Sequence, residues 1–91
     1  DQVITYPDNA PILYPNPASD VVNIRFPTVC RSNSQARIFT PEGKLIHSEE
    51  LPTNGLDQIQ LYTNHLTDGL YFLKIDYGET TNYNYFCIKK R

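Results

Sequence analysis

The sequence predicts an all-β domain, specifically an immunoglobulin-like antiparallel β-sandwich of about seven strands. Apolar and polar residues alternate along several short runs, which is typical of strands with one buried and one solvent-facing side. Turn signals made of glycine, proline and asparagine separate these runs at intervals typical of a sandwich. No stretch has a convincing helical period, so no helix is expected.

The first expected strands lie on either side of a proline-rich segment. Ile12–Tyr14 is short and ends at Pro15. From Val22 to Phe26 apolar residues alternate with polar ones, so this strand should turn one face to the core. Pro27 ends it, because proline cannot donate to a strand ladder.

A hairpin is expected in the middle of the chain. The polar stretch Arg31–Ser34 is interpreted as a loop, and the next strand runs from Ala36 to Thr40. In the turn that follows, proline presets φ and Gly43 supplies a positive φ. Leu45–Glu50 is then the strand that pairs back.

The second half of the chain continues this pattern. Pro52–Gly55 contains Asn-Gly, a favoured tight-turn dipeptide, and Gln58–Leu61 alternates cleanly. A turn ending at Gly69 opens the strongest expected strand, Leu70–Tyr77. A last strand follows, with an inner face formed by Asn84, Phe86 and Ile88.

Length and composition narrow the functional classes. Ninety-one residues suit one small domain, and the formal net charge of −2 disfavours a nucleic-acid partner, which usually requires a basic excess. No apolar run approaches the roughly 20 residues that span a bilayer, so no transmembrane segment is expected. The chain lacks an initiator methionine, and we expect it to be part of a longer protein. Residues 1–10 are expected to be a linker from an upstream domain, and residues 11–91 the sandwich.

Candidate catalytic and metal-binding residues are few. His47 is expected to be a solvated surface histidine, since its neighbours in sequence point to the opposite face of the strand. His65 lies in a polar loop and is interpreted in the same way. The histidines and cysteines lack zinc-site spacing, and the isolated glycines form no phosphate-binding loop. The sequence therefore predicts no enzyme, no catalytic residue, no metal and no cofactor.

Two further features leave alternatives open. Cys30 and Cys87 allow one disulfide, which would close a long loop worth about 4 kcal/mol in loop-entropy models, but two free thiols are the alternative. Tyr83 and Tyr85 should share the outer face of the last strand. Such a pair can stack on sugars or mark a partner surface, although tyrosines also simply suit strands.

Four segments follow one another along residues 11–91: Tyr14–Asp20, Ala36–Ile46, Leu66–Ile75 and Phe86–Lys90. The first contains Tyr-Pro-Asn-Pro, a small residue and Asp, and the third contains Leu-x-x-Gly-x-Tyr with a hydrophobic continuation. The second is a hairpin with a Gly turn, and the last is a hydrophobic, basic strand. In this order they resemble the type A C-terminal sorting domain of the type IX secretion system, found on cargo proteins of the Bacteroidetes.

The resemblance marks the following residues as sorting-signal positions: Pro15, Asn16, Pro17, Gly43, Gly69, Tyr71, Lys89, Lys90 and Arg91. Proline on both sides of Asn16 restricts this residue to an extended conformation. Tyr71 follows a turn, where its hydroxyl can reach nearby backbone as in a tyrosine corner. Only the basic tail Lys89–Arg91 has no expected structural role. It is either a solvated tail or the stretch that a receptor reads directly.

The resemblance implies a sorting function. The cargo would enter the periplasm by an N-terminal signal and fold there, and the outer-membrane translocon would then recognise this domain. A sortase-like cysteine protease would cut in the linker and can join the cargo to a lipopolysaccharide anchor. The expected final location is the outer-membrane surface or the extracellular space. On this view the domain is a substrate of its partners.

Two other functions remain open at this point. A carbohydrate-binding or adhesive module would use Tyr83 and Tyr85, and its saturable glycan binding would be lost in Tyr85→Ala. A passive immunoglobulin-like spacer would show neither a ligand nor a secretion phenotype. A sorting signal predicts instead that removing Ile88–Arg91 strands the cargo in the periplasm while the sandwich stays largely folded.

Overall fold

The computed structural model describes residues 10–90, so Arg91 and most of the expected linker, residues 1–9, lie outside the described residues. Seven strands occur in the described part of the chain. They are β1 (Ile12–Tyr14), β2 (Val21–Arg25), β3 (Ser34–Phe39), β4 (Leu45–Leu51), β5 (Gln58–Tyr62), β6 (Gly69–Tyr77) and β7 (Thr80–Ile88).

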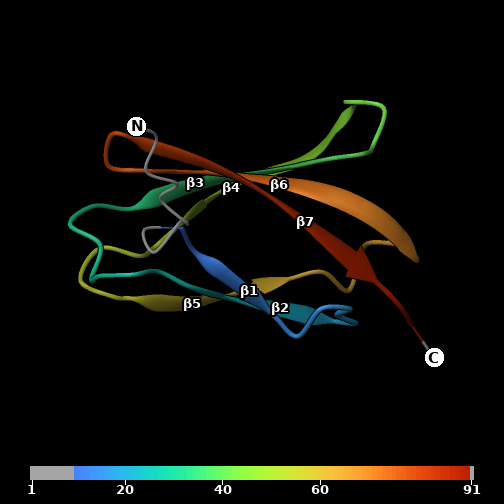
Figure 1. The fold of residues 1–91 in the computed structure, drawn as a ribbon, viewed down its shortest axis with the longest axis horizontal. Coiled ribbons are helices and arrows are strands. Elements are labelled where there is room, and N and C mark those ends of the chain that lie inside the picture. The colour runs from blue at the N-terminus through green and yellow to red at the C-terminus, as the bar shows by residue number, and fades with distance from the viewer. Residues whose placement is uncertain (1–9, 91) are drawn as a thin grey trace, which may run out of the picture.

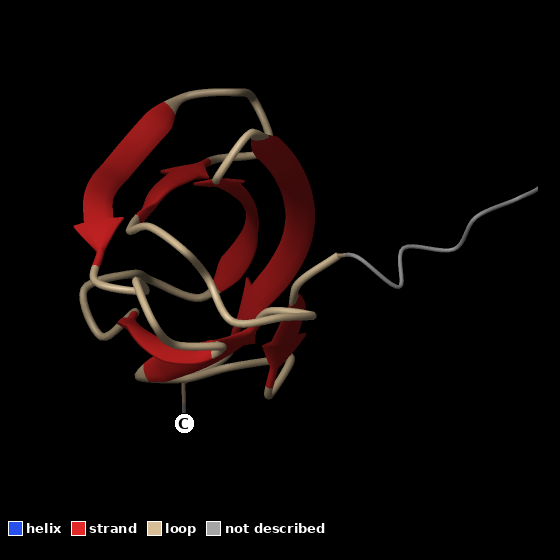
Figure 2. Cartoon of the chain, turned by 90° about the vertical axis from the view of Figure 1, so that its left-hand side faces the viewer, coloured by secondary structure: helices blue, strands red, loops and turns tan. Residues whose placement is uncertain are grey.

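The strands form two antiparallel sheets. One has three strands in the order β1-β2-β5, and the other has four in the order β4-β3-β6-β7. Figure 1 shows the sheets as two layers, and Figure 2 shows the strands curving around one interior. Residues 10–90 contain no helix, and so none that could cross a membrane. The predicted immunoglobulin-like β-sandwich is confirmed.

Alternation along the strands decides which side chains enter the core. On β7, Phe86 and Ile88 are buried while Tyr85 and Cys87 are exposed, as the period of two predicts. Hydrophobic side chains with 0% exposure come from five strands of both sheets: Val22, Ile24, Ala36, Ile38, Leu61, Leu73, Ile75 and Phe86. The interior of the sandwich is therefore filled from both layers.

A buried polar pair extends β3 into the stretch that was expected to be a loop. β3 begins at Ser34, whose side chain is 2% exposed. Its Oγ lies 2.7 Å from Oγ1 of Thr53, and this Thr53 hydroxyl donates to the main-chain oxygen of Ser32 at 3.0 Å. Because the Thr53 proton goes to Ser32, the Ser34 hydroxyl must donate to Thr53. This pair joins β3 to the β4–β5 connection.

Candidate functional site

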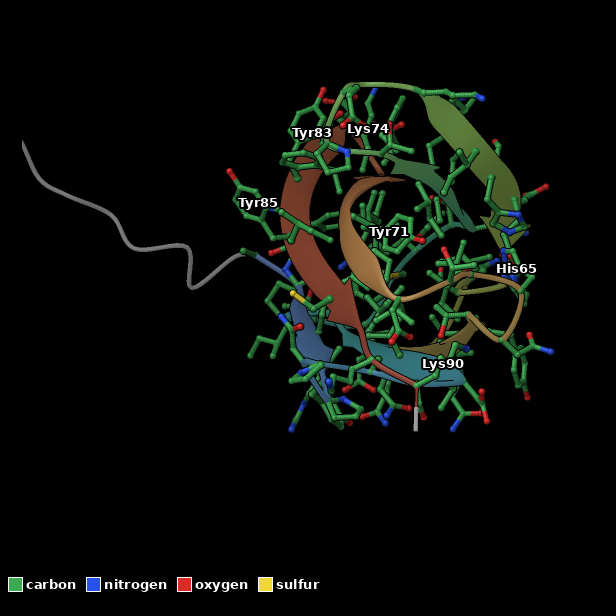
Figure 3. All side chains as sticks on the ribbon, turned by 90° about the vertical axis from the view of Figure 1, so that its right-hand side faces the viewer. His65, Tyr71, Lys74, Tyr83, Tyr85 and Lys90 are labelled. Atoms are coloured by element: carbon green, nitrogen blue, oxygen red, sulfur yellow. The ribbon has the colours of Figure 1, made fainter. Side chains whose placement is uncertain are left out.

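Three segments far apart in the sequence meet at the C-terminal end of β7. They are Asn16–Asp20, Thr63–Asp68 and Cys87–Lys90, and we call them together the C-terminal latch. The first connects β1 to β2, and the second connects β5 to β6. Figure 3 shows Lys90 at this end of the molecule, beyond the end of β7 and against the three-stranded sheet. The latch therefore ties the last strand to the opposite sheet.

The first segment pairs with β7 like a short extra strand. The N–H of Ala18 donates to the oxygen of Cys87, and the N–H of Lys89 donates to the oxygen of Ala18, both at 2.8 Å. Ala18 and Ile88 form a parallel bridge. The side chain of Asn16 adds a bond, because its Oδ1 accepts the N–H of Cys87 at 2.9 Å. Asn16 thus has a structural role in holding the end of β7.

Lys90 binds the other two segments of the latch. Its main-chain N–H donates to Oδ1 of Asp68 at 2.7 Å. Its Nζ donates to the main-chain oxygens of Ser19 at 2.8 Å and Thr63 at 3.3 Å, and to Oδ1 of Asp20 at 3.4 Å. The three N–H groups of the ammonium thus have three oxygen partners. The expectation that the basic tail has no structural role is wrong for Lys90.

Lys89 differs from Lys90 in the direction of its side chain. The main chain of Lys89 is held by Ala18, but its side chain is exposed. Successive residues of an extended segment point to opposite sides, so binding Lys90 inward turns Lys89 outward. Within the described residues, the latch therefore presents one lysine of the tail to solvent.

Thr63 is the buried centre of the latch and was not singled out from the sequence. It is 0% exposed, its N–H donates to the oxygen of Asp20 at 2.8 Å, and its hydroxyl donates to the oxygen of Ser19 at 3.0 Å. The oxygen of Ser19 therefore accepts from both Thr63 and Lys90. Asp20 and Asp68 lay inside the recognised segments, but no local pattern marked Thr63.

Tyr71 forms the tyrosine corner that its position predicted. Its side chain is buried, and its hydroxyl donates to the main-chain oxygen of Thr67 at 2.8 Å. The preceding Gly69 has a φ of 152°, which side-chain-bearing residues rarely adopt. The corner therefore fixes the loop that carries Asp68, the residue that accepts the N–H of Lys90.

Replacing Tyr71 by phenylalanine should weaken this loop without emptying the core. The ring stays packed while the bond to Thr67 is lost, so we expect a loss of about 1 kcal/mol in the free energy of unfolding. Urea unfolding followed by circular dichroism measures this change. Tyr62→Phe is the control, because the Tyr62 side chain is 63% exposed and its hydroxyl makes no hydrogen bond within residues 10–90. An equal loss in both variants would contradict the role of the Tyr71 hydroxyl.

The remaining motif residues serve turns. Pro15 and Pro17 flank Asn16, and the peptide bond before each is cis. Gly43 has a φ of 94° in the β3–β4 hairpin, where its N–H donates to the oxygen of Thr40 at 2.9 Å. This hairpin lies apart from the latch (Figure 1). The structure thus brings most of the predicted positions together, but not Gly43.

Tyr83 and Tyr85 lie on the outer face of β7, as predicted (Figure 3). Their side chains are 64% and 63% exposed. The Tyr85 ring packs on Phe72 with 4.6 Å between centroids, and Nζ of Lys74 lies 6.0 Å from the centroid of Tyr83. A shallow hollow of about 370 Å³ adjoins them, lined by Phe39, Gly43, Phe72 and Tyr83. A partner or sugar at this face stays a prediction.

A comparison with known protein families identifies the family of this chain. Residues 12–89 match the model described as a secretion system C-terminal sorting domain, which is nearly the whole sequence. The chain belongs to this family. None of the curated proteins compared with it matches. The matched range contains both loops of the latch and all seven strands.

The family establishes the general role of this sorting domain. It is a C-terminal signal of type IX secretion, so it acts with a cargo polypeptide and with the secretion machinery. Its cargo is destined for the cell surface or the extracellular space. A signal of this kind is not itself an enzyme.

In the sorting domain, the His47 side chain is less exposed to solvent than the sequence predicted. The His47 side chain is 27% exposed, and its Nε2 lies 2.6 Å from Oε1 of Glu49. Its ring also lies against that of His65, tilted by 50° with 4.7 Å between centroids. The His47 side chain is thus only partly solvated, and it contacts Glu49 because residues two apart on a strand share a face. Among residues 10–90, no group of three or more potential ligands is placed to hold a metal ion.

The two cysteines of the sorting domain are free thiols. Cys30 is buried beside Tyr77 and Thr80, at the start of β7, whereas Cys87 is exposed near its end. At about 3.3 Å per residue, the length of β7 separates them far beyond disulfide range. The bridge that the sequence allowed is therefore not formed.

Burial, and to a smaller extent the charge of Cys30, raises the pKa of the Tyr77 hydroxyl.

Proposed function

We propose that the outer-membrane translocon recognises this sorting domain in its folded form, through the C-terminal segment that the latch holds. The threefold binding of the Lys90 ammonium by Ser19, Thr63 and Asp20 carries this proposal. It commits one basic residue to the fold and leaves the neighbouring Lys89 exposed. The receptor would then read Lys89 on a rigid strand end.

The latch explains how separate sequence motifs act as one signal. Asn16 holds the N–H of Cys87, and Asp68 holds the N–H of Lys90. Neither residue needs to touch the receptor, because each one positions the tail. A chain that loses either contact presents Lys89 on a mobile end, which raises the entropic cost of binding.

We further infer that cargo release occurs outside the sandwich. A sortase-like cysteine protease would cut within or upstream of residues 1–10, and the attacking thiolate would belong to that protease. The latch is in keeping with this division, since the residues that it ties to β7, Asn16–Asp20, come after residues 1–10 in the sequence. The family match provides the export role on which this step depends.

A secretion assay tests the role of Lys89. The sorting domain is fused behind a periplasmic reporter in a host that carries the type IX system, and the secreted fraction is measured. We expect Lys89→Glu to reduce secretion strongly with an unchanged urea midpoint, because the side chain is exposed. Lys44→Glu, the same charge change on another exposed lysine, should be secreted normally.

Normal secretion of Lys89→Glu, or equal loss in Lys44→Glu, would contradict the proposal. Deleting Ile88–Arg91 is a less specific test than the sequence suggested. Ile88 is 3% exposed and belongs to the core, so its removal is expected to destabilise the sandwich as well. Substitution at Lys89 separates the two effects.

A further inference from the structure

β7 has a strand edge that is only half covered. It is the last strand of the four-stranded sheet, and β6 is its only neighbouring strand in the described part of the chain. Near its C-terminal end the free edge is paired with Ala18. Between Thr81 and Tyr85 no other segment of residues 10–90 pairs with it.

The register shows which backbone groups point outward from this edge. In an antiparallel ladder, alternate residues turn their N–H and C=O toward one neighbour and then away from it. Cys87 and Lys89 turn theirs away from β6, toward Ala18. By the same alternation Thr81, Tyr83 and Tyr85 also face outward. They form a row of donors and acceptors spaced two residues apart.

This edge lacks the features by which proteins usually protect a free strand. Such edges commonly carry charged side chains, proline or a bulge. β4, at the other side of the same sheet, carries Glu49 and Glu50, and a register shift occurs where it pairs with β3 at Ile38. β7 contains no charged residue and no proline, and its pairing with β6 is continuous from Gly69 to Tyr77. The open edge is thus suited to pairing.

We propose that the Thr81–Tyr85 edge of β7 binds an extended strand of the secretion machinery by β-strand addition. The inference rests on the proposed function and names a second part of the surface that the translocon reads. Regularly spaced main-chain donors and acceptors match an extended peptide backbone. Alternate side chains of the added strand would pack on the exposed rings of Tyr83 and Tyr85, which favours apolar or β-branched residues there.

The position of the latch supports a partner strand as the occupant. Asn16–Ala18 already pairs with the end of β7, so an added strand would continue the same line and stop beside it. It would end next to the exposed Lys89, which makes the edge and the tail one continuous surface. A second copy of the domain fits less well, since the five-residue edge alone buries far less than the roughly 1,200 Å² of a stable interface, whereas the translocon would bind Lys89 as well.

The test uses proline at an outward-facing position of the secreted reporter fusion. Tyr83→Pro removes an N–H that does not bond to β6, so the β6–β7 ladder should survive. Tyr83→Thr is the matched control, because it also removes the ring but keeps the N–H and a strand-forming side chain. We expect secretion to fall about tenfold for Tyr83→Pro, because the added strand loses its hydrogen bond to the N–H of residue 83 and meets the proline ring instead. For Tyr83→Thr we expect secretion to fall less than about twofold.

Two measurements keep the result interpretable. Amide hydrogen exchange on the wild-type domain should show fast exchange at Thr81, Tyr83 and Tyr85 and slow exchange at Asn82 and Asn84. Protection of both sets would overturn the proposal. If Tyr83→Pro lowers the urea midpoint, Tyr85→Pro replaces it, because its N–H also faces outward.

The outcomes separate this inference from the proposed function. Failure of the wild-type fusion to leave the periplasm would remove both. Normal secretion of a folded proline variant, with Lys89→Glu still impaired, would overturn the strand-addition site alone. An equal loss of secretion in Tyr83→Thr would show that the effect comes from the missing ring, as for a bound glycan. That result would also overturn the strand-addition site. A dimer of the wild-type domain that sedimentation detects and Tyr83→Pro abolishes would also overturn the strand-addition site, because the edge would then bind a second copy.

Discussion

Phe86→Ala is expected to destabilise the sorting domain by about 3–5 kcal/mol, the largest stability loss among the changes considered. The Phe86 side chain is 0% exposed and packs on Tyr71 with 5.7 Å between ring centroids. Its removal opens a cavity that the two sheets can close only by moving closer together, which the packing of the other core side chains opposes. Because Phe86 adjoins the latch through Cys87, the signal should be lost with the fold.

Urea unfolding measures this effect, and the adjacent residue is the control. Tyr85→Ala removes a ring of similar size from the exposed side of the same strand. Its cross-strand contact with Phe72 should make the loss about 1 kcal/mol or less. Similar losses in both variants would show that the two faces of β7 are wrongly assigned.

Thr53→Val should cost about 2 kcal/mol, because it leaves buried polar groups without partners. Valine has a similar shape, but it lacks the hydroxyl that binds Ser34 and the oxygen of Ser32. The Ser34 hydroxyl, buried on β3, would then lose its acceptor. Leaving a buried polar group unsatisfied costs more than the bond itself contributes.

A double-mutant cycle with Ser34→Ala checks this explanation. Removing both hydroxyls leaves no unpaired hydroxyl, so Thr53→Val should cost less in the Ser34→Ala background than in the wild type. The free energies of unfolding from urea titrations give the coupling. Additive losses would show that the short contact between the two hydroxyls contributes nothing of its own.

Local patterns predicted much of the fold and part of the site. Alternation placed Phe86 inside and Tyr83 outside, and the position of Tyr71 after a turn predicted its bond to the backbone. The start of β3 was missed, because Ser34 enters the strand through its contact with Thr53. His47 lies on the predicted strand, but its contact with Glu49, two residues along on the same face of β4, was not foreseen.

The strands, their faces and the family resemblance follow from the sequence, because side-chain alternation and turn chemistry act over a few residues. The role of the basic tail depended on the tertiary structure. Lys90 is separated by 71 residues from Ser19, whose oxygen it binds, and Cys87 by the same number from Asn16. Contacts of such separation form only when the sheets pack. That packing turns Lys90 into a structural residue and leaves Lys89 exposed.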